Sequence, residues 1–532
     1  MKEKLNKTVT LYTLLMLIVF PLFMVHSYYD IQTVKMYFYQ LSTLACAGIS
    51  ALIAAVYLMK GCGGKKPKQS DRKPIAERLR GVLRTSDVFA LIFLLAVIIS
   101  TVCSEWVYEA FWGNTGRYQG GYMLILFVVS YFLITRYYVP KRIHMDIVLG
   151  AGIIVCGWGV LDYFSLSPVG FAYDTLFSST IGNIDVLTSI EAMYVAMAAV
   201  MYIAECPSDK VSKRRSAYYL FASCVCFMGL ECGRTANLLL SVAFLICFLP
   251  FYAFGSVRGT LNYIRVLIVW LIGMLIVAEL VSAFPDYAVS PDYMGELDAI
   301  ANNHVSLLLY AVCAMLLLYC ILYGIFRKCY GTEAISCAGG VSDAEHRLAK
   351  KLRTVWGILG VIALCVCVYI FRDANTGGHP ELYAPVSNLV IFDEKWGTNR
   401  GYVWRLAMKY FGDFSLFKKI VGSGPETFSI YVMKYDLNAT LRQFDASYDS
   451  IHNEWIQHLF ECGIVGFIGF YGMSLASCVT GLKNGRMTAA LSFAVLTYII
   501  QSFVNISVPI VLPFVIICIA AAASENKVDY GQ

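Results

Sequence analysis

The sequence predicts an all-α protein that crosses a membrane many times, and three observations support this fold class. The chain has 532 residues, of which 58% are hydrophobic and 15% charged, and its mean hydropathy is +0.63. Soluble domains are about 45–50% apolar and about 25% charged, so a soluble protein of this length could not bury its apolar surface. The same composition excludes a disordered chain. Apolar runs of about 20 residues, the length that spans a bilayer, recur along the chain.

We predict about 14 membrane-spanning helices, within a range of 12–14, from the positions of these runs. The upper number requires the last two runs to be separate around Pro509 and the seventh and eighth to be separate around Gly233. The first run carries Pro21 and lacks a cleavage site of small residues, so we expect an anchor or first span rather than a removed signal peptide. The predicted spans are residues 8–27, 36–59, 87–103, 120–138, 145–163, 186–204, 217–232, 235–254, 263–283, 303–325, 354–371, 459–480, 488–505 and 507–524.

Basic residues predict the orientation of the spans, because Lys and Arg collect in short loops on the cytoplasmic side. With the N-terminus inside, the inner segments hold 30 of the 42 Lys and Arg residues. The outer segments hold the other 12, and nine of these lie in one long loop, to which the rule does not apply. Both termini are therefore expected in the cytoplasm. The net charge of +6 is accounted for by orientation and gives no indication of nucleic-acid binding.

The long outer loop divides the chain into three parts. Residues 1–371 carry the first eleven spans, residues 372–458 form the loop, and residues 459–532 carry the last spans and a short cytoplasmic tail. A connection of 87 residues is too long to be unstructured in a compact protein. The loop is rich in Trp, Tyr and Phe and contains an amphipathic stretch at residues 400–411. Aromatic residues with a cationic face suit the membrane–water interface, so we predict a small, partly helical subdomain on the outer face.

The cysteines give no sign of a metal site or of a disulfide framework. Most of the 18 lie in apolar runs, where Cys behaves as a small hydrophobic residue. The sequence contains no CxxC pair and no Cys/His cluster with the spacing of metal ligands. We therefore expect neither a metal nor another cofactor.

Four arginines on the predicted outer side are candidates for binding an anionic ligand: Arg117, Arg234, Arg400 and Arg405. Arg117 could instead extend to the interface, and Arg234 could form a structural ion pair with Glu231, one helical turn away. A cation between two short spans is expensive unless it is paired or faces water, which favours a ligand-binding role for Arg234. Arg400 and Arg405 diverge by about 140° on a helix, so one is expected to bind a ligand and the other to tether the loop.

His452 is the strongest single candidate for a catalytic residue. It follows Ser450, a plausible N-cap, and is expected in the first turn of the helix that becomes the twelfth span. The helix dipole disfavours the imidazolium there, and a neutral imidazole is what a general base requires. Asn453 could orient a substrate hydroxyl. The alternative is a histidine that only joins the cap to the helix.

The segment around Gly422 and Gly424 is a turn by composition. Such a turn can also present backbone N–H groups to an anion, so both glycines are candidate substrate contacts, with a plain turn as the alternative.

These groups together predict a reaction class. Arginines bind phosphate oxygens bidentately, and a lipid-linked pyrophosphate would lie at the depth of the predicted outer loops. A histidine beside the cations could take a proton from an attacking hydroxyl, while the arginines stabilise the departing pyrophosphate without a metal. The prediction is glycosyl transfer from a lipid pyrophosphate donor to a hydroxyl acceptor on the outer face.

The order of the motifs resembles that of the O-antigen ligase and O-antigen polymerase superfamily of bacterial surface-polysaccharide enzymes. The hydropathy layout, with one large outer loop before the last spans, carries part of the resemblance. The most specific part is His452-Asn453 followed by Glu461-Cys-Gly463-Ile-Val-Gly466, which is similar to the family's His-Asn…Gly-x-x-Gly pattern. The other matching segments are Gly182-Asn183, Cys232-Gly-Arg234-Thr, Arg400-Gly-Tyr-Val-Trp404-Arg and Gly422-Ser-Gly424 with Phe428. Two departures are the glycine before Arg234 and Ile184-Asp185 in place of Pro-Asn.

The resemblance implies a metal-independent, inverting glycosyltransferase of the membrane-embedded (GT-C-like) type in a bacterial cytoplasmic membrane. Its donor would be a polyprenyl-pyrophosphate-linked oligosaccharide and its acceptor a glycan or a lipid, with other polysaccharide-assembly proteins as further partners. By motif, Arg234 and Arg400 would hold the pyrophosphate and His452 would activate or position the acceptor; Arg117 and Arg405 are added from charge placement alone. Ligase, polymerase and protein O-oligosaccharyltransferase share these motifs.

A transporter or flippase for the lipid-linked sugar is the alternative, since many transporters have a similar number of spans. Transporters more commonly show internal repeats, broken helices at the midplane and charges deep in the spans. No repeat is evident in the sequence, and the candidate cations lie at the outer boundary. These features favour the enzyme.

Overall fold

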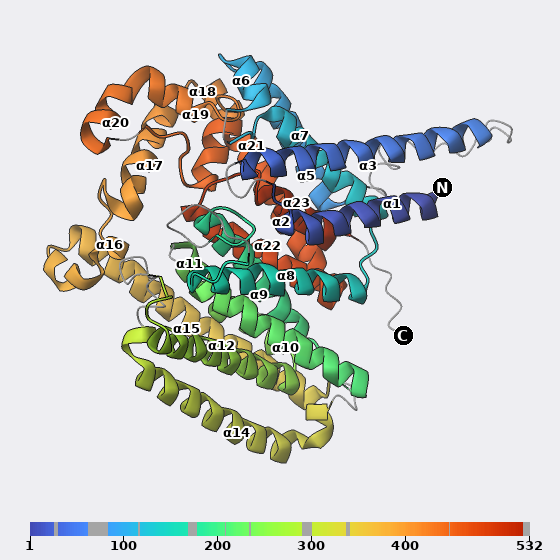
Figure 1. Cartoon of the computed structure of the whole chain (residues 1–532), viewed down its shortest axis with the longest axis vertical. Coiled ribbons are helices and arrows are strands. Elements are labelled where there is room, and N and C mark those ends of the chain that lie inside the picture. The colour runs from blue at the N-terminus through green and yellow to red at the C-terminus, as the bar shows by residue number, and fades with distance from the viewer. Residues whose placement is uncertain are drawn as a thin grey trace.

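The computed structural model describes residues 1–25, 30–61, 83–114, 117–168, 178–207, 209–233, 236–289, 301–336, 341–445 and 447–524. Within these ranges the regular elements are helices and no strand occurs, so the all-helical fold class is confirmed. Most of the long helices run side by side, and the helices of the long loop gather at one end of this bundle (Figure 1).

Each of the fourteen predicted spans is helical. Helices satisfy their own backbone groups, which is why apolar runs take this form in a membrane. The first span is composite, with a π-helical segment between two α-helical ones. The bounds are α1 Lys2–Leu14, η1 Leu15–Val19, α2 Phe20–Leu22, α3 Ile31–Gly61, α5 Thr85–Val102, α7 Gly121–Tyr137, α8 Arg142–Tyr163, α9 Ile184–Ile203, α10 Lys210–Glu231, α11 Ala236–Ala253, α12 Val257–Ala283, α14 Val305–Ser336, α15 Asp343–Thr376, α21 Glu454–Asn484, α22 Arg486–Gln501 and α23 Leu512–Ala522.

In the described part of the chain, 10 helices are long and apolar enough to cross a membrane. Three further apolar stretches, Gly121–Tyr137 of α7, Asn237–Ala253 of α11 and Leu512–Ala522 of α23, have 10–17 residues. The remaining predicted span, α10, begins with Lys210, Lys213, Arg214 and Arg215, and these charges lower the hydropathy of its first two turns. The fold is therefore that of a polytopic membrane protein, with shorter helices among the predicted spans.

Helix α9 is the centre of the bundle. Every residue in its most apolar stretch is buried, and it contacts α8, α10, α11, α12 and α22. Its N-cap is Asn183, whose Oδ1 accepts the N–H of Val186 at 3.1 Å. Asp185 therefore lies in the first turn of the most buried helix, at the end of the bundle that faces the loop.

Helix α14 lies at the edge of the bundle (Figure 1), and the apolar stretches of α14 and α15 are almost entirely exposed, with 11% and 0% of the residues buried. Such fully apolar, exposed surfaces are compatible with lipid and not with water. Both helices therefore present their sides to the bilayer.

The long loop is folded and helical. It contains η4 Pro380–Val386, α16 Ser387–Val390, α17 Trp396–Asp413, α18 Leu416–Val421, α19 Phe428–Tyr431, η5 Val432–Asp436 and α20 Leu437–Phe444. An aromatic cluster that includes Trp404, Tyr410, Phe414 and Phe460 joins the loop to the start of α21. That helix begins at Glu454, earlier than the predicted boundary at residue 459.

At the opposite end of the bundle, one residue, Glu205, contacts several basic groups. Glu205, which is 1% exposed, accepts an ion pair from Arg142 at the start of α8 and another from Arg486 at the start of α22. Its main-chain oxygen accepts a hydrogen bond from Arg258 in the first turn of α12 at 3.1 Å. Because α9 runs from Ile184 to Ile203, just before Glu205, this network lies at the end away from the loop.

Helix α21 is broken at Gly463, where φ is +68° and ψ is −176°. The break leaves the carbonyl groups of Phe460 and Glu461 without helical partners, and these accept the N–H groups of Ser423 at 3.1 Å and Gly424 at 3.0 Å. A Cβ at position 463 would lie 2.3 Å from the carbonyl oxygen of Ile420. The loop is thus fixed to the bundle through main-chain contacts that only glycine permits.

The cysteines are for the most part packed as apolar side chains. Cys46, Cys156 and Cys226 are buried and carry no disulfide. Cys206 is disulfide-bonded, a bond that the sequence does not indicate, although one such bond is not a disulfide framework.

Replacing Gly463 with Ala is expected to destabilise the protein by about 2–4 kcal/mol, because the backbone conformation is almost exclusive to glycine and the added Cβ meets a carbonyl oxygen. Thermal unfolding of the purified protein in detergent measures this as a fall of several degrees. The control is Gly360→Ala in α15, where a Cβ has nothing within 4 Å. Equal stability of the two variants would contradict the account of the break.

Candidate functional site

Three segments far apart in the sequence meet at the start of α9 and α21. Arg400 of the loop contacts Asp185 of α9, with 3.6 Å between Nη2 and Oδ2. Arg117, in the connection before α7, holds Asp449 with both arms of its guanidinium at 2.9 and 3.0 Å. His452 lies within the field of both arginines. We call Arg117, Asp185, Arg400, Asp449 and His452 the outer cluster.

Arg400 begins the regular part of α17. The preceding residues Gly397, Thr398 and Asn399 all have positive φ, between +60° and +69°. This conformation is strained for Thr, which is β-branched, and strain of this kind is concentrated at functional sites. The turn starts the helix so that the Arg400 side chain, 14% exposed, reaches across to Asp185.

Arg117 is positioned by a buried carboxylate that was not a candidate from the sequence. Glu426, 5% exposed, accepts the main-chain N–H groups of Asn114 and Gln119, on either side of Arg117. The side chain of Asn114 donates to the carbonyl oxygen of Glu426 and to Ser429 Oγ at 2.7 Å. Burial raises the pKa of Glu426 to about 7, although the two N–H groups oppose this shift. The loop therefore holds the connection that carries Arg117.

Asp449 also holds Arg117 in place, because its carboxylate accepts the hydrogen bonds of the guanidinium group. Burial alone would raise its pKa, but the hydrogen bonds and the charge of Arg117 outweigh burial and lower it. The carboxylate is therefore ionised near neutral pH and remains paired with Arg117. The pair joins the chain before α7 to the chain before α21, three residues ahead of His452.

His452 lies just before α21 and not within its first turn, so the prediction of its position is wrong. The N-cap is Asn453, whose Oδ1 accepts the N–H of Ile456 at 3.0 Å, and not Ser450. Ser450 Oγ instead accepts the N–H of His452 at 3.3 Å. His452 has a φ of +54°, a left-handed conformation that is uncommon for non-glycine residues.

The electrostatics of this position keep His452 neutral. Burial, followed by the positive charges of Arg400 and Arg117, lowers the pKa of His452 from 6.5 to about 4, and the negative charge of Asp449 offsets only part of this shift. The expected neutral imidazole is thus present for a different reason: burial and two arginines rather than a place inside the helix.

The two polar atoms of the Asn453 side chain differ in their hydrogen bonding. Its Oδ1 caps α21, but Nδ2 is buried and has no hydrogen-bond partner among the residues that the structure describes. Buried amide groups are almost always hydrogen-bonded. This nitrogen is therefore a candidate donor to a ligand oxygen.

Gly422 and Gly424 form the predicted turn, with φ of +91° and +111°. Their N–H groups are not available to an anion. The N–H of Gly422 donates to Lys418 at 2.8 Å, and the N–H groups of Ser423 and Gly424 donate to the broken part of α21. A Cβ on Gly422 would lie 2.1 Å from the carbonyl oxygen of Glu461. The geometry gives both glycines a structural role in place of the substrate contact predicted from the sequence.

Arg405 contacts a different part of the loop from Arg400. Its guanidinium lies 5.5 Å from the ring of Phe392, donates to the carbonyl oxygen of Phe392 at 3.3 Å and lies 3.9 Å from Glu394. Its side chain is 52% exposed. The two arginines diverge as their spacing predicts, and Arg405 tethers the loop.

Arg234 lies outside the described residues. The described residues on either side contact the first turns of α9: Asn237 Nδ2 donates to the carbonyl oxygen of Asp185 at 2.9 Å, and a Cβ on Gly233 would lie 2.7 Å from Thr188 Oγ1. The role of Arg234 therefore stays a prediction from sequence.

A cavity of about 520 Å³ opens in the loop between α17, α18 and η5. Aromatic rings, two lysines and two aspartates share its wall. The lining residues are Lys409, Tyr410, Asp413, Phe414, Ser415, Lys418, Tyr431, Tyr435 and Asp436. Within the described ranges, no group of three or more His, Cys, Asp or Glu side chains could hold a metal ion.

Sequence reasoning missed two functional partners, Asp185 and Glu426. Asp185 was noted only as a departure from a family motif, and Glu426 lay unremarked after Gly424-Pro. Neither has a local signal, because each acts through a residue that is more than 200 positions away in the chain.

Comparison with protein-family models and with curated proteins gives no match. The resemblance to the O-antigen ligase and polymerase superfamily therefore rests on the hydropathy layout and the motifs of the sequence.

The low pKa of His452 can be tested by nuclear magnetic resonance of protein labelled at the histidine ring, with the His452 signal assigned by its loss in His452→Asn. We expect a titration midpoint near pH 4, because burial and two cations oppose protonation. Arg400→Gln and Arg117→Gln should each raise the midpoint, whereas Arg442→Gln, an exposed cation of α20, should not. A midpoint near 6.5 in the unaltered protein would contradict the account.

The link between Arg117 and Asp449 should appear as an energetic coupling. A double-mutant cycle with Arg117→Gln and Asp449→Asn is expected to give a coupling energy of about 0.5–1 kcal/mol. The pair is bidentate, but Asp449 is 59% exposed. Denaturant titration in detergent measures the free energy of unfolding of the unaltered protein, the two single variants and the double variant. The exposed pair Lys7–Glu3 serves as the control and should show no measurable coupling.

Proposed function

We propose that this chain is a membrane-embedded glycosyltransferase that moves an oligosaccharide from a polyprenyl-pyrophosphate donor to a hydroxyl acceptor at the outer face of a bacterial cytoplasmic membrane. The observation that supports the proposal best is the neutral His452, which lies at the start of α21 with two arginines from distant segments beside it. A neutral imidazole next to cations is suited to accept a proton where an anion is bound.

The donor's pyrophosphate would bind at Arg400, with Arg234 as the second cation by motif. Among the described residues, the ion pair of Arg400 is the long contact with Asp185 at 3.6 Å, so phosphate oxygens could replace this partner with shorter, bidentate hydrogen bonds. Arg117 is already held by Asp449 at 2.9 Å. Its role in the proposal is to hold the chain before His452 in place and to contribute its positive charge.

The reaction can then be written with its bonds balanced. The acceptor hydroxyl gives its proton to His452 while its oxygen forms a bond to the anomeric carbon of the donor sugar. The bond from that carbon to the pyrophosphate oxygen breaks, and polyprenyl pyrophosphate leaves with the electron pair. Attack from the side opposite the leaving group inverts the anomeric configuration. The arginines stabilise the developing charge on the leaving group.

Donor binding would also adjust the basicity of His452. A pKa near 4 makes the imidazole neutral but weakly basic, and general bases are most efficient when their pKa lies near the working pH. The negative pyrophosphate would offset the charge of the arginines that lower this pKa. The histidine would therefore become a better base once the donor is bound.

Two further features fit a saccharide substrate. The unpaired Nδ2 of Asn453 could donate to a sugar oxygen beside His452. The cavity in the loop offers aromatic rings, including Tyr410 and Tyr435, together with Asp and Lys side chains. Apolar ring faces combined with a few polar groups are the usual lining of small-molecule sites, so the cavity is the proposed place for the glycan that extends from the reacting sugar.

A transporter or flippase of the lipid-linked saccharide is the second candidate, and the break in α21 at Gly463 favours it, since transporters use broken helices. In this chain, however, the carbonyl groups freed by the break are taken by the loop. The enzyme is therefore preferred.

Purified full-length protein is expected to form a new glycosidic bond when given polyprenyl-pyrophosphate-linked oligosaccharide and the acceptors of a membrane extract from the native host. His452→Ala, Arg400→Ala and Arg234→Ala should each lower kcat/KM by about 10²–10³-fold, as measured by mass spectrometry of the product. Arg442→Ala, on the exposed side of α20, is the control. Full turnover by Arg234→Ala and His452→Ala would contradict the assigned roles, and sugar translocation without bond formation would favour the transporter.

A further inference from the structure

Helix α15 changes from charged to apolar at one point along its length. Four basic residues lie between Arg347 and Arg353, and from Val355 onward the helix is apolar and exposed for several turns. The indole nitrogen of Trp356 donates to the carbonyl oxygen of Cys247 in α11 at 2.8 Å. A charged segment followed by Trp and an exposed apolar stretch marks the boundary between lipid headgroups and lipid chains.

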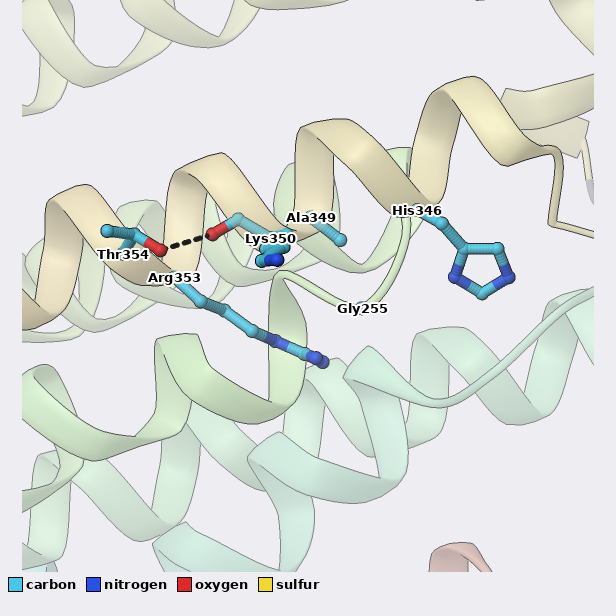
Figure 2. A pocket seen from close by; sticks show the side chains of 6 residues that line it. All are labelled: Gly255, His346, Ala349, Lys350, Arg353 and Thr354. Carbon is cyan, nitrogen blue, oxygen red and sulfur yellow. Dashed lines mark hydrogen bonds between the residues drawn. The ribbon is translucent and has the colours of Figure 1, made fainter.

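A cavity of about 460 Å³ lies at this boundary, between α15 and the turn that joins α11 to α12. His346, Lys350 and Arg353 are spaced i, i+4 and i+7, so they share one face of α15. Figure 2 shows Arg353 reaching from α15 toward the turn at Gly255, with Lys350 and His346 following along the helix. The other lining residues are Ala349 and Thr354.

The glycine in the turn leaves space for the guanidinium group. A Cβ at Gly255 would lie 3.0 Å from Nη2 of Arg353, which is closer than most real contacts. The cation is thus directed into the cavity, where the main chain of the turn forms the opposite wall.

The charges of this cavity are unbalanced, in contrast to those nearby. No acidic side chain lines it, and neither Lys350 nor Arg353 forms an ion pair with any residue in the described part of the chain. Arg142 and Arg486, at the same end of the bundle, are both paired with Glu205. Within the described residues, the site is therefore concave and carries two cations without an acidic partner, which suits an anion.

The position of the cavity separates it from the outer cluster. Arg258, three residues after Gly255, donates to the main chain of Glu205, and Glu205 lies at the end of α9 opposite Asp185. The cavity is therefore at the predicted cytoplasmic face, where membranes carry negative lipids.

We propose that this cavity binds the phosphate group of an anionic phospholipid. Arg353 and Lys350 hold the phosphate oxygens, and the acyl chains lie along the exposed apolar side chains of α15, beginning at Val355 and Ile358. Basic pockets between membrane helices on the cytoplasmic side are suited to such headgroups. The site is independent of the proposed transferase activity.

The test uses the full-length protein in nanodiscs of phosphatidylcholine with a minor fraction of phosphatidylglycerol, followed by gentle extraction and native mass spectrometry of the retained lipids. Phosphatidylglycerol is expected to be retained preferentially. The variant Lys350→Gln/Arg353→Gln should lose this preference by about tenfold or more. Arg347→Gln/Lys351→Gln is the matched control, because it removes the same charge from exposed positions of the same helix that do not line the cavity.

Three results would overturn the proposal. One is equal loss of phosphatidylglycerol from both double variants, which would indicate general attraction to a basic helix. Another is retention of the lipid by Lys350→Gln/Arg353→Gln. The third is displacement of phosphatidylglycerol by millimolar inorganic phosphate, which would assign the cavity to a free anion. The charge-conserving variant Lys350→Arg/Arg353→Lys should retain the lipid, which separates loss of charge from loss of folding.

Discussion

The break in α21 at Gly463 is the constraint on which the outer face of the protein depends. A helix in a membrane normally satisfies its own backbone, and here the break leaves the carbonyl groups of Phe460 and Glu461 to be satisfied by the turn at Ser423 and Gly424. Two residues after that turn, Glu426 accepts the N–H groups on either side of Arg117. Arg117 in turn holds Asp449, three residues before His452. The single non-helical residue Gly463 is thus connected, contact by contact, to the position of the candidate base.

Charged side chains are paired differently at the two ends of the bundle. At the end away from the loop, Glu205 is shared by Arg142 and Arg486 at 1% exposure, which is a closed structural network. At the loop end, the ion pair of Arg400 with Asp185 is longer, and His452 is held neutral beside two cations. Buried ion pairs contribute little to stability beyond offsetting their own desolvation.

Hydropathy was sufficient to locate the helices and the folded loop, because about twenty apolar residues in succession have few alternatives in a membrane. It could not locate the contacts between segments. The cap of α21 was assigned to Ser450 although Asn453 is the cap, since both residues favour that position and local sequence does not separate them. The glycines at 422 and 424 were predicted to face a ligand, and only the break at Gly463 shows which carbonyl groups take up the N–H groups of this turn. Asp185 and Glu426 needed the tertiary fold to be recognised at all.

The central claim is that Arg400 and His452 form a site for a lipid-linked pyrophosphate at the loop end of the bundle. Electron cryomicroscopy of the full-length protein in lipid nanodiscs with a non-hydrolysable polyprenyl-pyrophosphate sugar would test it most directly. The account predicts pyrophosphate density in hydrogen-bond contact with Arg400, in place of the contact to Asp185, with the anomeric carbon on the side of His452. Pyrophosphate bound away from both residues, with the pair of Arg400 and Asp185 unchanged, would contradict it.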